Sequence, residues 1–227
     1  MKRFYKDVAA GDDGGILLDG RAVKTPARAP LALPTTALAD AVAEEWRAQG
    51  DEIDPRAMPL TGLANAAIDR VAPDPVTFGA GLAAYAESDL LYYRADHPAA
   101  LVARQAERWD PLLNWARTRY DVHFELANGI VHRAQPKATL TRLGEALAAR
   151  APFALAAFSP LVTISGSLVI ALALAEGAVT LDGAWQAAML DELWQEEQWG
   201  EDSLATQARD ARRRDFEAAA HFLALLD

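Results

Sequence analysis

The chain has 227 residues, of which 52% are hydrophobic and 24% are charged, and its formal net charge is −10. Such an acidic balance argues against binding nucleic acid through its phosphates and against docking on anionic lipid. The chain contains no cysteine, which excludes disulfides, thiolate metal sites and a cysteine nucleophile.

The first 57 residues are predicted to form a small β-rich domain with one helix. Asp19-Gly20 lies between two short apolar runs, and this dipeptide suits a two-residue hairpin turn because both central residues need positive φ. The polar, proline-containing segment 51–59 is the expected boundary of the domain. Strands are expected at residues 4–8, 16–18 and 21–23.

The helix of this predicted domain is expected between Thr35-Thr36, which offers an N-cap, and Gly50. Leu38, Val42 and Trp46 recur every four residues and define one stripe of that helix. A tryptophan on such a stripe is more often a core residue than a contact for a partner, and both interpretations of Trp46 stay open.

Residues 58–227 are predicted to form a larger, mainly helical bundle domain that contains one β-hairpin. Apolar residues recur with helical spacing through most of this region. The exception is the alternating run 122–126, which leads into Asn128-Gly129, a hairpin turn signal that would place Glu125 opposite His132. Helices are expected at about residues 60–71, 75–85, 98–116, 136–147, 161–176, 181–199 and 203–226.

The stretch from Ala151 to Ala175 carries no charge. Pro160 is expected to separate a short turn from a helix that ends at Gly177. A helix that is apolar on every face has to be surrounded by other elements. The alternative is a membrane span, which needs about 20 apolar residues, whereas polar residues and Pro160 interrupt this stretch. A buried central helix is therefore expected.

We find no catalytic motif with convincing spacing. The glycines near the N-terminus belong to turns and do not form a phosphate-binding loop. The four histidines lack the clustering that a metal needs, although His123 and His132 would lie close together on the predicted hairpin. Ser165 does not lie in a nucleophile-elbow sequence. We therefore expect no metal and no cofactor.

The segment from Leu190 to Asp202, LDELWQEEQWGED, gathers six carboxylates around two tryptophans. One interpretation is an amphipathic helix end with exposed acids. A second is a general acid and base in a small hydrolase or transferase, although nothing in the sequence predicts a raised pKa. A third is a docking surface on which tryptophan anchors a partner protein and the acids meet its basic groups.

Seven segments in this order resemble one known family. They are RFYKDV, LDGRAVKTP, EEWRAQGDEIDP, MPLTGLANAAID, SDLLYYRADHP, RWDPLLNWA and LDELWQEEQWGED. They span nearly the whole chain and resemble the assembly chaperones for the alpha subunit of F-type ATP synthase, a family with mitochondrial and α-proteobacterial members. The resemblance implies an α+β fold, with an N-terminal β-rich domain followed by an orthogonal helical bundle, and a chaperone without enzymatic activity or cofactor.

The resemblance also implies a partner and a site. Such a chaperone binds the unassembled alpha subunit, shields the surface that the beta subunit later covers, and gives way when the beta subunit arrives. Family members depend on the tryptophan of the EEWRAQ motif, here Trp46, and on an acid of the motif ending in WG, assigned here to Glu192. Ala66 and Tyr92 depart from the family pattern outside the expected site. The expected partner-binding residues are Asp191, Glu192, Gln195, Trp199, Glu201, Asp202 and Trp46.

The N-terminus shows neither an apolar signal core nor an Arg- and Ser-rich transit peptide. We therefore expect a bacterial cytoplasmic protein, or the mature form of a protein of the mitochondrial matrix. It is expected to be monomeric when free, with no nucleic-acid partner and no stable membrane insertion. A weaker alternative is a peripheral membrane protein that inserts the segment 151–175.

Overall fold

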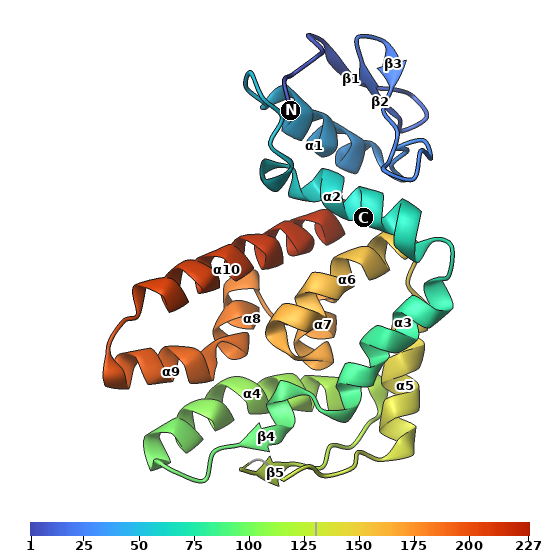
Figure 1. Cartoon of the computed structure of the whole chain (residues 1–227). Helices are drawn as coiled ribbons and strands as arrows, with labels where there is room; N and C mark the ends of the chain where they lie inside the picture. The colour runs from blue at the N-terminus through green and yellow to red at the C-terminus, as the bar shows by residue number, and fades with distance from the viewer. Residues whose placement is uncertain (130) are drawn as a thin grey trace. The chain divides into compact units, whose positions relative to one another are not determined.

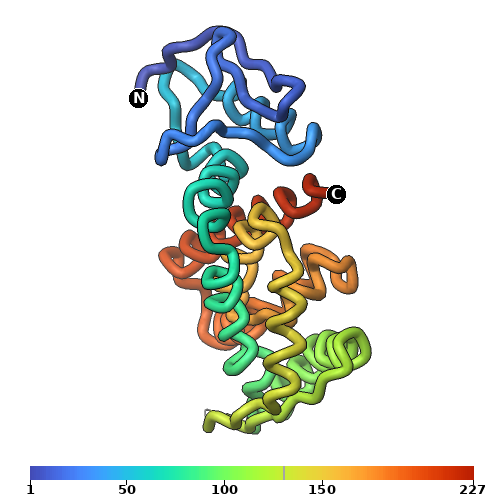
Figure 2. Tube along the Cα trace, turned by 90° about the vertical axis from the view of Figure 1, so that its right-hand side faces the viewer, coloured from blue at the N-terminus to red at the C-terminus, as the bar shows by residue number. Residues whose placement is uncertain are grey.

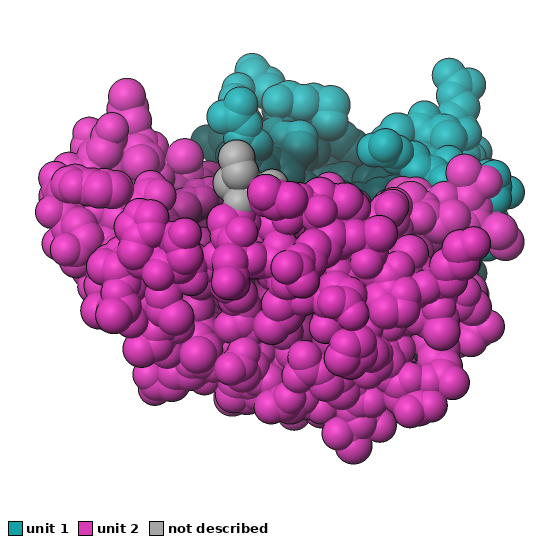
Figure 3. Space-filling view, turned by 90° about the horizontal axis from the view of Figure 1, so that it is seen from below, with its two compact units in different colours: residues 1–75, 151–157, 218–227 teal, residues 76–150, 158–217 magenta. Residues whose placement is uncertain are grey.

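The computed structural model describes residues 1–129 and 131–227, which form two compact units. Unit 1 comprises Met1–Pro75, Ala151–Ala157 and Ala218–Asp227, and unit 2 comprises Val76–Arg150 and Phe158–Glu217 (Figure 3). This division differs from the predicted boundary at residue 57, because residues 58–75 and two later segments pack with the first 57 residues. The domain boundary at residue 57 therefore stays a prediction.

The sheet of unit 1 has three antiparallel strands in the order β1 (Val8–Ala10), β2 (Ile16–Leu18) and β3 (Arg21–Ala22) (Figure 1). The predicted hairpin turn is confirmed, since Asp19 and Gly20 have φ of 49° and 75°. The first strand begins later than expected. The Asp19 carboxylate accepts the backbone N–H groups of Lys6 and Asp7 at 3.0 and 2.8 Å, so these donors do not enter the ladder.

The core of unit 1 lies along α1 (Thr36–Arg47). The Thr35 hydroxyl accepts the N–H of Leu38 and thereby caps the helix, as the sequence predicts. Leu38 and Val42 are fully buried in a cluster that also contains Phe222 of the C-terminal segment. The other helical elements are η1 (Pro55–Ala57), α2 (Pro59–Ala66) and the turn η2 (Ala67–Val71) that continues α2.

Unit 2 is organised around α7 (Leu168–Ala175), in which residues 168–173 are fully buried. It packs against α4 (Ala99–Tyr120) and α8 (Leu181–Ala188), which confirms the expected buried central helix. The start of that helix was predicted wrongly: Pro160 lies inside α6 (Pro152–Ser165), and the break comes at Gly166, whose φ is 65°. Within the described residues, no helix is both long enough and apolar enough to cross a membrane.

The remaining helices of unit 2 surround this centre. α5 (Lys137–Ala148) runs beside α3 (Pro75–Ala83) and the turn η3 (Ala84–Glu87), as Figures 1 and 2 show. The helix expected at residues 181–199 is divided at Met189 into α8 and α9, because the Met189 backbone (φ −99°, ψ 9°) leaves the helical region. The other elements are η4 (Leu90–Tyr92), β4 (Tyr93–Arg94), β5 (Ala127–Asn128), α9 (Leu190–Trp199) and α10 (Ser203–Ala224).

The α+β fold class is confirmed, but the predicted hairpin of unit 2 is wrong. In the described part of this segment, which leaves out Ile130, β5 pairs in parallel with β4. The side chain of Gln135 takes the place of a ladder partner: its Oε1 accepts the N–H of Glu125 at 3.0 Å and its Nε2 donates to the Glu125 carbonyl at 2.9 Å. Glu125 Oε1 lies 3.5 Å from His123 Nε2 and not beside His132. The Nδ1 atom of His132 lies 3.1 Å from the hydroxyl of Tyr93.

Candidate functional site

The six carboxylates of residues 190–202 all have partners within unit 2. Three of them form ion pairs with arginines: Glu192 with Arg212, Glu196 with Arg209 and Glu197 with Arg104. The others accept hydrogen bonds, Asp191 from the Gln105 amide, Glu201 from the Thr206 hydroxyl and Asp202 from the N–H of Leu204. The four acids of α9 therefore hold it to α4 and α10, Glu201 and Asp202 bond to the first turns of α10, and the six do not share one partner.

The pKa shifts of the α9 carboxylates do not fit the interpretation as a general acid and base. Hydrogen bonds from Arg212 lower the pKa of Glu192, and hydrogen bonds from Arg104 lower the pKa of Glu197. A general acid at neutral pH needs the opposite shift. The described residues also contain no group of three or more His, Cys, Asp or Glu side chains that could hold a metal ion. The hydrolase alternative thus has no support in the geometry.

A groove of about 600 Å³ lies beside α9, and we call it the α9 groove. Its walls come from α9, from residues 93–98 and from the first turns of α4, all within unit 2. Among the predicted partner-binding residues, Asp191, Gln195 and Trp199 line it, and Glu192, Glu201 and Asp202 do not. Trp194 and Gln198 complete the α9 wall, so this wall carries mainly aromatic and amide groups.

Gln105 of α4 joins the two walls of the α9 groove. Its side chain is only 2% exposed. Its Oε1 accepts the backbone N–H of Ala95 at 2.8 Å, and its Nε2 donates to Asp191 Oδ1 at 2.8 Å. Both ends of the buried amide are satisfied, as a buried polar group requires. One buried side chain of α4 therefore links the two walls through hydrogen bonds.

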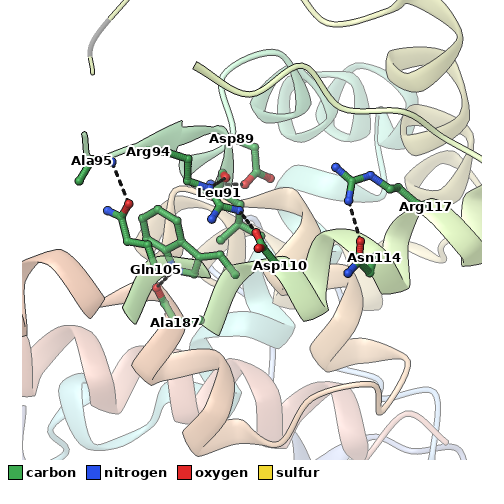
Figure 4. Close-up of polar contacts among 10 residues, drawn as sticks. Asp89, Leu91, Arg94, Ala95, Gln105, Asp110, Asn114, Arg117 and Ala187 are labelled. Carbon is green, nitrogen blue, oxygen red and sulfur yellow. Dashed lines mark hydrogen bonds and ion pairs between the residues drawn. The ribbon is translucent and has the colours of Figure 1, made fainter. Parts of the chain in front are cut away.

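The floor of the α9 groove is held by Arg94, which Figure 4 shows between Asp110 and Leu91. Its Nη2 donates to Asp110 Oδ1 at 2.7 Å and its Nε donates to the Leu91 carbonyl at 2.9 Å. The guanidinium also lies over the ring of Trp109, 5.3 Å from the centroid. Trp109 in turn donates to the carbonyl of Ala187 at 2.9 Å. This network fixes β4 to α4, and α4 to α8.

The outer wall of the α9 groove ends in Trp199, which is 79% exposed. Trp194 is held by Arg104, whose guanidinium lies 4.8 Å from the ring centroid. Gln195 and Gln198 offer both donors and acceptors along the same wall. A groove with an exposed aromatic rim, neutral amides and a fixed floor can bind a segment of another polypeptide.

Trp46 belongs to unit 1, whereas the α9 groove belongs entirely to unit 2. Trp46 is partly buried and packs against both hydrophobic clusters of unit 1. It also lines a hollow of about 530 Å³ together with Phe4 and Tyr5. Its indole N–H is buried and has no acceptor among the described residues. The two interpretations of Trp46, core and contact, therefore both have a structural basis.

Comparisons with known proteins point to one family. The family model described as ATP12 chaperone protein matches residues 2–117. The chain is similar to the crystal structure of Atp12 from Paracoccus denitrificans, with 40% identity, a TM-score of 0.94, and coverage of 100% of this chain and 98% of that one. The Atu1473 protein of Agrobacterium tumefaciens is 44% identical, with a TM-score of 0.94 and coverage of 100% and 86%. The mitochondrial protein atp12 of Schizosaccharomyces pombe is 25% identical over 215 residues, which cover 88% of this chain and 74% of that protein.

Proposed function

The chain belongs to the ATP12 chaperone family, and we propose that it binds the unassembled alpha subunit of F-type ATP synthase. In this proposal it shields the alpha-subunit surface that the beta subunit later covers, and so promotes assembly of the catalytic head. The family membership supports the chaperone role, and the seven sequence segments support the choice of client. The chaperone needs no reaction of its own for this role.

The observation that carries the proposal is the exposed Trp199 at the rim of the α9 groove. An unassembled subunit presents an apolar interface that is prone to aggregation. Tryptophan is enriched among the residues that dominate binding energy, and it supplies a large contact area at low entropic cost. The amides of Gln195 and Gln198 can satisfy backbone groups of a bound segment, which would otherwise lose hydrogen bonds to water.

The remaining predicted contacts have different roles in this proposal. Asp191 lies in the α9 groove but is already held by Gln105, so we assign it to the shape of the groove. Glu192, Glu201 and Asp202 would form an acidic margin that meets basic groups of the client. Trp46 would either contact the client through the hollow of unit 1 or act by keeping that unit folded.

The release step needs no energy source in the chaperone. The beta subunit has to bind the same alpha-subunit surface more tightly than the chaperone does, or block its return. We further propose that the chaperone is monomeric when free. We place it in the bacterial cytoplasm, or in the mitochondrial matrix for a mature eukaryotic form; bacterial and mitochondrial relatives support this placement.

The test uses the full chain and the alpha subunit of the same organism. We expect the two to co-purify, and we expect added beta subunit to displace the chaperone. Trp199→Ala should weaken binding about 30-fold, as the loss of a central interface tryptophan does. Val76→Ala removes another exposed apolar side chain outside the α9 groove and should leave the affinity unchanged. Equal binding by Trp199→Ala and wild type would refute the α9 groove as the docking surface, and absence of any complex would refute the client.

A further inference from the structure

A second hollow of unit 2, with a volume of about 650 Å³, is lined by charged groups. It lies where the C-terminal ends of α4 and α7 meet α5, three helices labelled in Figure 1. Arg119, Arg142 and Arg150 line it together with a single carboxylate, Glu176. The lining therefore has two more positive than negative charges, in a protein whose net charge is −10. We call this hollow the arginine pocket.

Two of the three arginines are held in place by Glu176. Arg119 Nε donates to Glu176 Oε2 at 2.6 Å, and Arg150 Nη2 donates to Glu176 Oε1 at 2.8 Å. The hydroxyl of Tyr120 donates to the same Oε1 at 2.8 Å. Each guanidinium also rests on an aromatic ring, Arg119 on Tyr120 at 5.1 Å and Arg150 on Phe158 at 5.5 Å. These guanidinium groups are thus oriented before any ligand arrives.

Glu176 stays ionised in this setting. Burial alone would raise its pKa, but the hydrogen bonds from Tyr120 and Arg119 and the charges of Arg119 and Arg150 outweigh burial, so the pKa is lowered. One carboxylate cannot saturate two guanidinium groups, each of which has five N–H donors. Within the described residues, Arg119 uses only its Nε–H for hydrogen bonding, and the other donors remain available.

The position of Arg142, the third arginine, indicates a binding site and not only a structural cluster. Glu176 is the C-cap residue of α7, where the helix dipole is negative. Two arginines suffice to compensate the carboxylate and the dipole. Arg142 does not contact Glu176; its side chain is 44% exposed, and its Nη1 donates to the backbone carbonyl of Asp121 and to the carboxylate of Asp121, whose side chain is 91% exposed. Such an exposed pair contributes little and exchanges readily for another anion. The small side chains of Ala146 and Ala149 leave the space between the arginines open.

We propose that the arginine pocket binds a phosphate group, either free or carried by a small organic molecule. A phosphate ester carries about 1.5 to 2 negative charges at neutral pH, more than the single charge of a carboxylate, and the pocket offers three guanidinium groups to meet that charge. Guanidinium groups also bind phosphate oxygens bidentately. The volume exceeds what one phosphate fills and lies in the range of small-ligand sites, so a phosphate ester also fits. This inference does not depend on the proposed chaperone role.

The test measures binding of inorganic phosphate, pyrophosphate and ribose 5-phosphate to the full chain by calorimetry, at low and matched ionic strength. We expect saturable binding that weakens with added salt, because the site is open to solvent. Tighter binding of inorganic phosphate than of ribose 5-phosphate would support a free phosphate as the ligand, and the reverse order would support an ester. Acetate at the same concentration should not compete.

The matched variants are Arg142→Gln and Arg117→Gln. Arg142→Gln keeps the contacts of Glu176 and should lower phosphate affinity about tenfold through the loss of one charge-assisted contact. Arg117→Gln removes an arginine at the C-terminal end of α4 that binds Asn114 and does not line the pocket, and it should leave the affinity unchanged. Absence of saturable binding, equal binding of acetate, or wild-type affinity in Arg142→Gln would each overturn the proposal. Far-ultraviolet circular dichroism of both variants confirms that they are folded.

Discussion

At the scale of single residues, Asp89 is a fully buried carboxylate that links two distant parts of unit 2. One of its oxygens accepts the N–H of Leu91 at 3.0 Å, and the other accepts the N–H of Val169 at 3.0 Å in the first turn of α7. Burial raises its pKa from the ordinary 3.8 to about 6, although hydrogen bonds from Ser167 and the backbone act in the opposite direction. The carboxylate thus joins η4 to the central helix at an electrostatic cost.

The raised pKa of Asp89 predicts a specific pH dependence of stability. The folded state holds the proton more tightly than the unfolded state between about pH 4 and pH 6. The contribution of protonated Asp89 to the free energy of unfolding is therefore fully present below pH 4 and is lost as the pH rises through about 6. It amounts to about 3 kcal/mol of unfolding free energy. Asp89→Asn should remove this component, so that the stability of wild type relative to the variant falls between pH 4 and pH 7.

Urea unfolding of wild type and Asp89→Asn at several pH values measures this difference directly. The control is Asp40→Asn, an exposed carboxylate of α1. This variant measures how the loss of one exposed carboxylate changes the unfolding free energy at each pH. A pH-independent difference for Asp89→Asn would show that the buried carboxylate does not titrate as described.

The charge of Glu192 allows a second prediction at the scale of single residues. Its ion pair with Arg212 is about half exposed on each side, so it contributes at most about 1 kcal/mol to stability. We therefore expect Glu192→Lys to weaken alpha-subunit binding while helicity and melting temperature change little. Pull-down with alpha subunit and a thermal melt measure the two effects. Glu217→Lys reverses a comparable exposed pair, that with Arg213, and should not affect binding. Normal binding by Glu192→Lys would remove this acid from the docking surface.

At the scale of elements, the break between α6 and α7 shows how a local conformation shapes the core. Gly166 has a φ of 65°, and its carbonyl accepts the N–H of Leu90 at 2.9 Å. Ser167 then caps α7 by accepting the N–H of Ile170 at 3.0 Å. Ser165-Gly166-Ser167 carries the sequence signal for this break, which lies six residues after the predicted one at Pro160. Pro160 lies inside α6 although an interior proline removes one helical hydrogen bond and crowds the carbonyl four residues earlier.

Gly166→Ala should destabilise the protein by about 1–2 kcal/mol, because a Cβ is strained at positive φ. Gly81→Ala is the matched control, since Gly81 lies inside α3 and a Cβ there would meet nothing within 4 Å. This second change should stabilise the protein by about 0.5–1 kcal/mol through helix propensity. Chemical unfolding of both variants measures whether each change lowers or raises the free energy of unfolding. Equal effects would contradict the role assigned to the backbone of Gly166.

At the scale of the whole molecule, the two units are discontinuous in sequence. The cluster that buries Leu38 and Val42 in unit 1 also contains Leu60 and Ala64 of α2 and Phe222 of the C-terminal segment. Residues 1–57 alone lack these last three partners. A small segment without them buries too little apolar surface to offset the entropy of ordering the chain.

We therefore expect the fragment 1–57 to show no cooperative thermal transition by circular dichroism, whereas the full chain melts cooperatively. The measurement also tests the domain boundary that the sequence predicts at residue 57. A cooperative transition of the fragment would support an independent domain ending at residue 57.

Local patterns in the sequence were sufficient for the first hairpin turn, the cap of α1 and the buried segment around α7. Asp19-Gly20, Thr35 and the uncharged segment around α7 act through φ preferences, backbone hydrogen bonds and apolar periodicity, which depend on near neighbours. The family resemblance extended this reading to the chaperone role, because its segments span the chain.

Only the tertiary structure decided where the side chains of the sites meet. Gln105 contacts Asp191 across 86 positions, and Arg119 contacts Glu176 across 57. Neither pair follows a local period, so no pattern in the chain predicts it. The predicted pairing of Glu125 with His132 is wrong for a more local reason, since the side chain of Gln135 forms hydrogen bonds with the Glu125 backbone. Contacts between distant residues depend on how the helices pack, and packing is a property of the whole set of buried side chains.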